Sequence, residues 1–279
     1  LARAAAKGGN ILLNLGPKGD GTIDAPDAAI LQGLAAWMAV NGASIRGTQA
    51  TPLDRQPWGD STRKGSTLFL HVFRWPADGR LLVSGFRGKA KRAYLLADPA
   101  RKPLGIERSG PGDLRIILPA RAPDAADSVV VLETDGALDA VRDRVVDTKY
   151  GQNQLLAFDA EAVGRGFRYG DGKAARYYVD GLEAAGNRLV WKVRGIGKAP
   201  VRFRLRYATL PGAAEGRFIL RYGTTVRRAP VVATRAATEM ALADFGDIAL
   251  RTDAPAPLEL SIEGAVPGSI HVFELLAGD

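Results

Sequence analysis

The sequence predicts a mainly β protein in which two antiparallel β-sandwiches follow a single strand–helix unit. Three observations support this fold class. Helical periodicity occurs in one segment only, between Asp24 and Gly42. After Gly47 the chain consists of short β-type runs separated by Gly, Pro and Asp, which is typical of antiparallel sheets. A charged stretch with few apolar residues, 133–147, divides these runs into two sets.

The strand–helix unit occupies residues 1–48. An apolar run at 11–15 predicts a short buried strand, and a glycine-rich turn follows it. Asp24 is the expected N-cap of the helix, with Pro26 in its first turn, and apolar residues then recur at helical spacing up to Gly42. A buried strand needs neighbours on both sides and helices above it, so we expect further chain upstream of this unit.

The first β domain is expected at 49–135 and a linker at 136–147. The predicted strands of this domain alternate in the manner of a sandwich, and they lie at 67–73, 80–83, 91–96, 113–118 and 128–132. The second β domain is expected at 148–279, where about eight strands suit a jelly roll. Its predicted strands lie at 175–179, 189–194, 201–207, 217–222, 231–234, 248–251, 258–262 and 269–275.

Composition excludes several classes of function. The chain has 279 residues, 46% of them hydrophobic, which is enough for two buried cores. It contains no cysteine, no apolar run long enough to cross a membrane, and two histidines that lie far apart in predicted strands. We therefore expect no disulfide, no metal, no cofactor and no membrane partner.

The formal net charge of +8 is spread along the chain. Its densest cluster is 201–207, where arginines alternate with apolar residues, so the arginines form the solvated face of a strand. A surface for a polyanion or a glycan is the alternative for this cluster, but no nucleic-acid partner is expected overall.

Three stretches carry a resemblance to a known family. The first is KGGNILLNLGPKGDGTI at 7–23, the second runs from Trp37 through Asn41-Gly42 to Gly47-Thr48, and the third begins at Trp58-Gly59 and reaches Trp75-Pro76 and Tyr94-Leu95-Leu96. Over roughly residues 5–100 the chain resembles the C-terminal part of family 29 glycoside hydrolases, the α-L-fucosidases. The resemblance implies that 1–48 are the last strand and helix of a truncated (β/α)8 barrel, followed by the family's C-terminal β-sandwich.

The same resemblance implies a retaining hydrolase that removes terminal α-L-fucose from glycans. The matched segment lies after both family carboxylates, so we expect no catalytic residue in this chain, which on its own is accessory and inactive. Asp20 lies between two glycines and is expected to form a turn. Asn10 and Asn14 flank the predicted strand near the barrel mouth and are candidates for the second shell of the sugar pocket, or for capping the loop backbone.

Residues 148–279 resemble, more loosely, the galactose-binding-like jelly rolls of carbohydrate-binding modules. Phe167 and Tyr169 in a glycine-rich loop, together with Tyr178 and Trp191, are the candidates for weak glycan binding, although Trp191 alternates with apolar neighbours as a core residue does. The alternatives to an enzyme part are a non-catalytic carbohydrate-binding protein or a structural appendix. A periplasmic or secreted bacterial location is implied by the resemblance alone.

Overall fold

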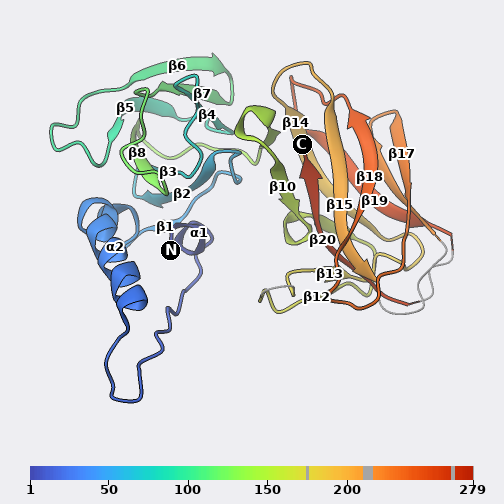
Figure 1. Ribbon diagram of the computed structural model, residues 1–279. Helices are drawn as coiled ribbons and strands as arrows, with labels where there is room; N and C mark the ends of the chain where they lie inside the picture. Colours follow the sequence, from blue (N-terminus) through green and yellow to red (C-terminus); the bar gives the residue numbers. More distant parts are fainter. Residues whose placement is uncertain (174–175, 210–215, 265–267, 279) are drawn as a thin grey trace. The chain divides into compact units, whose positions relative to one another are not determined.

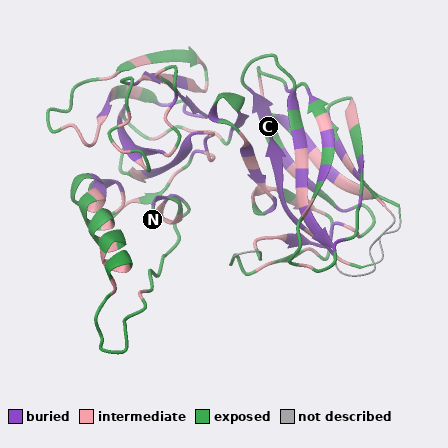
Figure 2. Cartoon of the chain, viewed as in Figure 1, coloured by how far each residue is buried: buried purple, intermediate pink, exposed green. Residues whose placement is uncertain are grey.

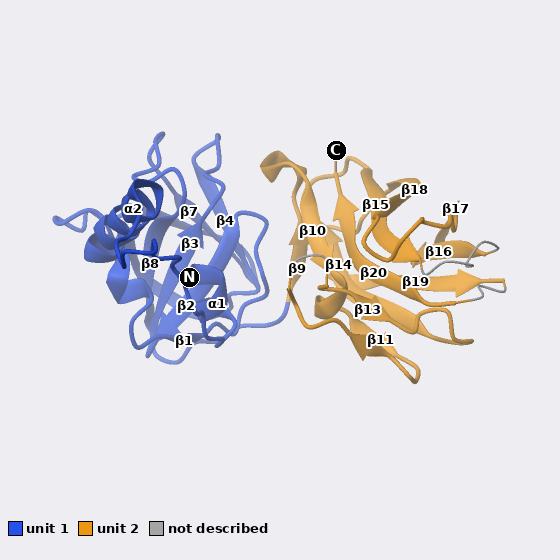
Figure 3. Ribbon diagram, turned by 60° about the horizontal axis from the view of Figure 1, so that its bottom comes forward, with its two compact units in different colours: residues 1–142 blue, residues 143–279 orange. Residues whose placement is uncertain are grey.

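A computed structural model describes residues 1–173, 176–209, 216–264 and 268–278 (Figure 1). The chain divides into two compact units, Leu1–Arg142 and Asp143–Asp279 (Figure 3). Both are built from sheets that are mainly antiparallel, which confirms the mainly β fold class. The division falls inside the stretch that was expected to be a linker. No helix within the described ranges is long and apolar enough to cross a membrane.

Unit 1 carries two helices at its start. These are α1 (Ala2–Ala6) and α2 (Ala25–Asn41), and a 3₁₀ turn, η1 (Gly42–Ser44), closes α2. The N-cap of α2 is Asp24, as predicted, because its carboxylate accepts a hydrogen bond from Asp27 N at 2.9 Å. Much of the outer surface of α2 is exposed (Figure 2).

Two sheets follow in unit 1. The first has the order β1-β2-β3-β8-β5 and the second the order β4-β7-β6. Their strands are β1 (Gln49–Ala50), β2 (Gly59–Lys64), β3 (Thr67–Val72), β4 (Arg80–Ser84), β5 (Lys89–Leu95), β6 (Gly105–Gly110), β7 (Asp113–Ile117) and β8 (Ser128–Asp135). Trp58 is fully buried, and its Nε1 donates to Leu82 O in β4 at 2.6 Å. This bond joins the start of the first sheet to the second.

The five-stranded sheet is buried on both faces. Alternate residues of a strand point to opposite sides of a sheet, and successive residues of β3 are buried. Leu68 and Leu70 of β3 lie on one face and are fully buried. Phe69 lies on the other face, in a cluster with Tyr94, Val129 and Val131, and the half-buried Trp37 of α2 packs against this cluster. The helix is thus held against the sheet by its aromatic residue.

Unit 2 is a sandwich of two sheets. One has the order β12-β13-β20-β15-β18 with β10 paired to β20, and the other has the order β11-β14-β19-β16-β17 with β9 paired to β14. The first sheet contains β10 (Asn153–Leu156), β12 (Arg168–Tyr169), β13 (Val179–Asp180), β15 (Val201–Thr209), β18 (Ala241–Ile248) and β20 (Ile270–Ala277). The second contains β9 (Arg144–Val146), β11 (Glu161–Val163), β14 (Arg188–Gly195), β16 (Arg217–Tyr222), β17 (Thr225–Pro230) and β19 (Ala256–Glu263). Two 3₁₀ turns, η2 (Thr148–Tyr150) and η3 (Ala157–Asp159), lie at either end of β10.

The core of unit 2 lies between the sheets. Phe203, Leu205 and Tyr207 of β15 are fully buried, whereas the intervening Arg202 is exposed and Arg204 and Arg206 are partly buried, as the alternation predicts. Two of these arginines form ion pairs with carboxylates of the same sheet. Arg202 pairs with Asp244, and Arg206 Nη1 donates to Glu274 Oε1 at 2.6 Å. The pairing leaves little of this cluster for a polyanion.

Five predicted elements differ in the structure. Residues 11–15 form no strand, and Leu12 is 91% exposed, because no described strand pairs with this segment. The expected linker at 136–147 contains β9, a buried strand that pairs in parallel with β14. The predicted strands at 231–234 and 248–251 are replaced by β17 and β18. Of the predicted strand at 175–179, residue 175 lies outside the described residues, and the part that forms a strand is Val179–Asp180.

Candidate functional site

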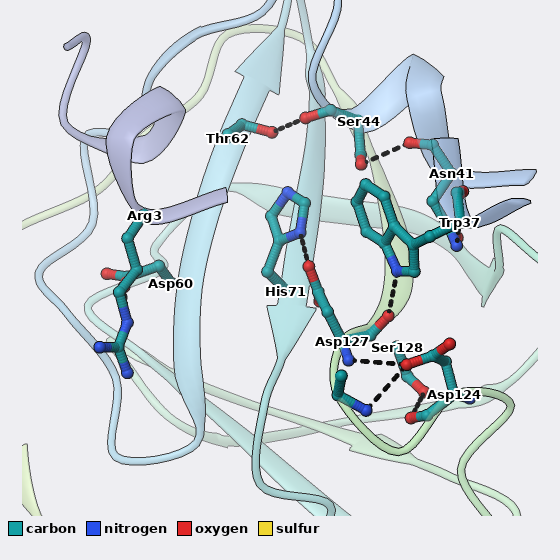
Figure 4. Close-up of polar contacts among 11 residues, drawn as sticks. Arg3, Trp37, Asn41, Ser44, Asp60, Thr62, His71, Asp124, Asp127 and Ser128 are labelled. Carbon is teal, nitrogen blue, oxygen red and sulfur yellow. Dashed lines mark hydrogen bonds and ion pairs between the residues drawn. The ribbon is translucent and has the colours of Figure 1, made fainter. Parts of the chain in front are cut away.

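A pocket of about 570 Å³ lies in unit 1 beside α2. Its lining is mostly apolar and consists of Leu1, Ala2 and Arg3 at the start of the chain, Ile30, Gly33, Leu34 and Trp37 of α2, Phe73 after β3, and Asp124, Ala126 and Asp127 before β8. The Trp37 indole closes one side, and its Nε1 donates to Asp127 O at 2.8 Å (Figure 4). The helix and the loop before β8 are therefore fastened together at the pocket wall.

Behind this wall lies a buried His–Asp pair. His71 Nδ1 is 2.9 Å from Asp127 Oδ2, and the side chains of His71 and Asp127 are 0% and 13% exposed (Figure 4). The Trp37 and His71 rings lie 6.3 Å apart. His71 Nε2 and Asp127 Oδ1 are buried and have no hydrogen-bond partner among the described residues. The pair supports the pocket wall from within the sheet.

The carboxylates at this pocket are engaged with the protein. Asp124 Oδ1 accepts from Ala126 N at 2.8 Å and from Asp127 N at 3.0 Å, which shapes the loop, and Asp127 is held by His71. Retaining glycoside hydrolysis needs two carboxyl groups about 5 Å apart that both face the sugar. The pocket does not offer such a pair. Among the described residues, no group of three His, Cys, Asp or Glu side chains could hold a metal ion.

The structure brings Asn10 and Asn14 to neither the pocket nor a strand. Both lie in the irregular segment before α2 and are exposed. Asp20 makes the expected turn, since its carboxylate accepts from Thr22 N at 2.9 Å and from Thr22 Oγ1 at 2.7 Å. These bonds, led by the Thr22 hydroxyl, lower the pKa of Asp20. The second-shell roles of Asn10 and Asn14 stay predictions.

Two of the four predicted sugar-binding aromatics in unit 2 belong to the core. Trp191 is 2% exposed between the sheets, and its Nε1 donates to Leu156 O at 2.9 Å. Trp191 occupies the core position that its alternation with Leu189 and Val193 indicated, because all three lie on the inner face. Phe167 is partly buried and packs against the same core, so it is a weak candidate.

Tyr178 directly precedes β13 and stacks on a histidine. Its ring is parallel to that of His271, with 3.7 Å between centroids and 3° between planes, and it meets Phe273 edge-on at 6.0 Å. Burial lowers the pKa of His271, which favours the neutral imidazole, against the opposing effect of the nearby Asp180 and Glu183 carboxylates. One face of the Tyr178 ring is thus covered by His271, and the Phe273 ring lies close to it.

Tyr169 is the one predicted aromatic that remains well exposed, at 54%. It stacks on Phe158 of η3, which is 38% exposed, with 5.7 Å between centroids and 24° between planes. Sequence reasoning missed Phe158, because this residue lies eleven positions before Tyr169, outside the glycine-rich loop, and no local pattern links the two. The fold of unit 2 brings η3 and β12, and with them the two rings, together.

The segment that carries Tyr169 is rigidly built. Asn187 Nδ2 donates to Arg165 O at 2.8 Å and to Gly181 O at 2.6 Å, and its Oδ1 accepts from Arg165 N at 3.0 Å. The clamp requires Gly164, which has φ +131° and whose added Cβ would lie 1.9 Å from Asn187 Oδ1. Beyond β12, Gly170 N donates to Tyr178 O at 3.0 Å, which extends the hairpin.

Known proteins resemble the chain most clearly at its start. Residues 1–43 match the family model described as alpha-L-fucosidase. The plasma alpha-L-fucosidase of Homo sapiens is 31% identical over 88 residues, which are 30% of this chain and 19% of that protein. The alpha-L-fucosidase of Dictyostelium discoideum is 30% identical over 131 residues, 44% of this chain and 28% of that protein.

The match to a solved structure extends over the whole chain. That structure is the alpha-L-fucosidase of Vibrio sp. strain EJY3, with a TM-score of 0.65, 18% identity, and coverage of 100% of this chain and 49% of that one. At this identity the likeness concerns the fold. The chain therefore spans about a fifth of the human relative and about half of the Vibrio structure.

Proposed function

Because the chain is related to the C-terminal part of the family 29 α-L-fucosidases, we propose that it serves such an enzyme as its accessory C-terminal region. The parent protein removes terminal α-L-fucose from glycans with retention. In this role unit 1 forms the surface against which the catalytic domain packs, and the chain alone has no hydrolytic activity.

The observation that carries the proposal is the exposure of large apolar side chains in the segment of unit 1 that matches the fucosidase family model. The matched residues include Ile11, Leu12 and Leu13, which are 53%, 91% and 53% exposed, and Ile30 of α2, which is 57% exposed. Apolar side chains gathered in this way are typical of a surface that another part of a protein covers. The apolar pocket beside α2 lies on the same unit.

The engagement of three carboxylates supports the proposed inactivity of the chain. Asp124 and Asp127 beside the pocket are committed to the loop and to His71, and Asp20 forms a turn. A complete (β/α)8 barrel needs about 250 residues, and the two helices of unit 1 account for a small part of one. The nucleophile and the acid/base therefore come from elsewhere in the parent protein.

The test compares this chain with a longer product of the same gene. The DNA upstream of the Leu1 codon is sequenced, and the longest open frame that contains the chain is expressed beside residues 1–279. Both proteins are assayed with an aryl α-L-fucoside, and a known fucosidase serves as the positive control. We expect nitrophenol release from the longer protein only. Release by residues 1–279 above the buffer rate, or a frame that starts just before Leu1, would contradict the proposal.

A further inference from the structure

We propose that the stacked rings of Phe158 and Tyr169 form a binding platform for a neutral glycan on unit 2. The choice of a glycan as the ligand rests on the proposed function, whereas the location of the platform rests on the structure alone. The platform comes from two segments, η3 and β12, that are not adjacent in sequence. Glycan binding here is a second activity, separate from the hydrolysis that the parent protein performs.

The exposure of both rings is enforced by their neighbours. On one side of Phe158, Ala157 is 1% exposed in the core, and on the other, Asp159 Oδ2 accepts from Arg144 Nη2 at 2.5 Å. The turn is thus pinned at both ends, and the phenyl ring between them points outward. Together with Tyr169, on which it stacks, the ring forms a continuous exposed aromatic surface.

Tyr169 is fixed in a similar way. The residue before it, Arg168, donates from Nε and Nη2 to Asp180 Oδ2 at 3.0 and 2.6 Å. The residue after it, Gly170, bonds through its N–H to Tyr178 O. The two rings are therefore positioned before any ligand arrives, which reduces the conformational entropy lost on binding.

The charges beside the rings favour a neutral ligand. Asp159, next to Phe158, is paired with Arg144, and Arg168, next to Tyr169, is paired with Asp180. None of these four residues therefore presents an unpaired charge beside the rings. A polyanion would gain little here, because the two arginines are already paired with carboxylates of the protein. A sugar ring suits this surface, since its C–H bonds can lie on the electron-rich face of an aromatic ring while its hydroxyls reach the polar rim.

The edge of the platform carries hydrogen-bonding groups next to Tyr169. Arg168 is 69% exposed in its side chain, so its guanidinium reaches solvent next to Tyr169 while it also holds Asp180. Its Nη2 lies 3.3 Å from Ser269 Oγ. An open platform with one or two rings and a polar rim buries one face of a sugar, so the affinity should be roughly millimolar to high micromolar.

The test uses residues 1–279 labelled with ¹⁵N and titrated, in separate experiments, with a fucosylated and a galactosylated oligosaccharide. Amide shifts in the heteronuclear spectrum report weak binding directly. We expect saturable shifts centred on 157–159 and 168–170. Tyr169→Ala and Phe158→Ala should each weaken binding at least about tenfold, the amount that one stacking contact is worth. Tyr169→Phe keeps the ring and should bind within about twofold of the parent chain.

Two controls guard the result. The first is Val232→Ala. Val232 is an apolar residue that is 57% exposed and lies far from both rings in sequence, so its loss should leave the affinity unchanged. The spectrum of each variant without ligand shows whether unit 2 is folded, so a loss of binding in a folded Tyr169→Ala protein supports the platform.

Three outcomes would overturn the proposal. The first is the absence of shifts with either oligosaccharide, and the second is binding that both alanine variants retain. The third is line broadening that depends on protein concentration without ligand and disappears in Tyr169→Ala, which would make the rings a contact between two copies of the chain. None of these outcomes affects the fucosidase proposal, because hydrolysis is measured on the longer gene product.

Discussion

The buried ion pair at the start of unit 2 allows a quantitative test of where this unit begins. Arg194 of β14 donates from Nε to both oxygens of Asp143 at 2.9 Å and from Nη2 to Oδ2 at 2.6 Å. The two side chains are 6% and 8% exposed. If the unit began only at residue 148, as the sequence suggested, this pair would contribute little. In the structure, the pair is buried next to the place where β9 pairs in parallel with β14.

The perturbation is Asp143→Ala, which leaves the Arg194 guanidinium buried without its carboxylate. Removing one partner of a buried pair lowers the free energy of unfolding by about 3–5 kcal/mol. With a urea dependence of about 2 kcal/mol per molar, a loss of 4 kcal/mol lowers the unfolding midpoint by about 2 M. The double variant Asp143→Leu with Arg194→Met replaces the pair by apolar groups and should recover most of this loss, because well-packed apolar substitutes for buried pairs are often neutral.

The assay follows each unit separately in the full chain. The protein has four tryptophans, and Trp191 alone lies in unit 2. Incorporated 5-fluorotryptophan therefore gives one fluorine resonance that reports the urea unfolding of unit 2, while the other three report unit 1. The matched control is Asp253→Ala, which breaks an exposed pair with Arg251 and should leave the midpoint unchanged.

Two results would refute the reasoning. One is a Trp191 midpoint that Asp143→Ala leaves in place, which would mean that the pair is solvated in solution. The other is a double variant as unstable as the single one, which would place the loss in the packing of β9 and not in the unpaired arginine.

Three further predictions concern other contacts. Asp127→Ala should lower the stability of unit 1 by roughly 2 kcal/mol, since it strips His71 of its buried partner, and urea unfolding compared with the exposed Asp135→Ala, which should not shift the midpoint, checks this. Trp37→Ala should speed proteolysis of residues 1–48, because the indole packs on the sheet and bonds to Asp127 O; equal rates in parent and variant would show that α2 is held by other contacts. The melting temperature of unit 2 should fall as the pH is lowered below about 6.5, the ordinary histidine pKa, because burial lowers the pKa of His271 and the unfolded chain binds the proton more readily; His271→Gln should show a flatter pH dependence over the same range.

Alternation and helix capping predicted several elements of the fold well. The strand at 201–207 and the N-cap at Asp24 rest on local rules, and β15 and α2 follow them. Residues 11–15 have the composition of a buried strand, yet a strand also needs hydrogen-bonding neighbours, and no described segment supplies them. Local sequence indicates what a segment can form and not whether its partners are present.

The remaining differences have one physical origin, which is contact between distant residues. The charge of Asp143 looked like that of a linker residue, because its pairing with Arg194, 51 positions further along the chain, is invisible to a local pattern. Phe158 and Tyr169 meet for the same reason, through the fold of unit 2. Trp191 shows the converse case, where the alternation of its neighbours correctly indicated a core position.

The two ends of unit 2 lie next to each other. Asn153 in β10 pairs with Ala277 in β20, and a Cβ added to Gly278 would lie 3.4 Å from Thr148 Cγ2. A domain whose ends meet can be inserted into a surface loop of an unrelated protein, or removed from its own, without stretching the chain on either side. Unit 2 thus has the geometry of a transferable cassette, and the same sandwich could accompany quite different catalytic partners.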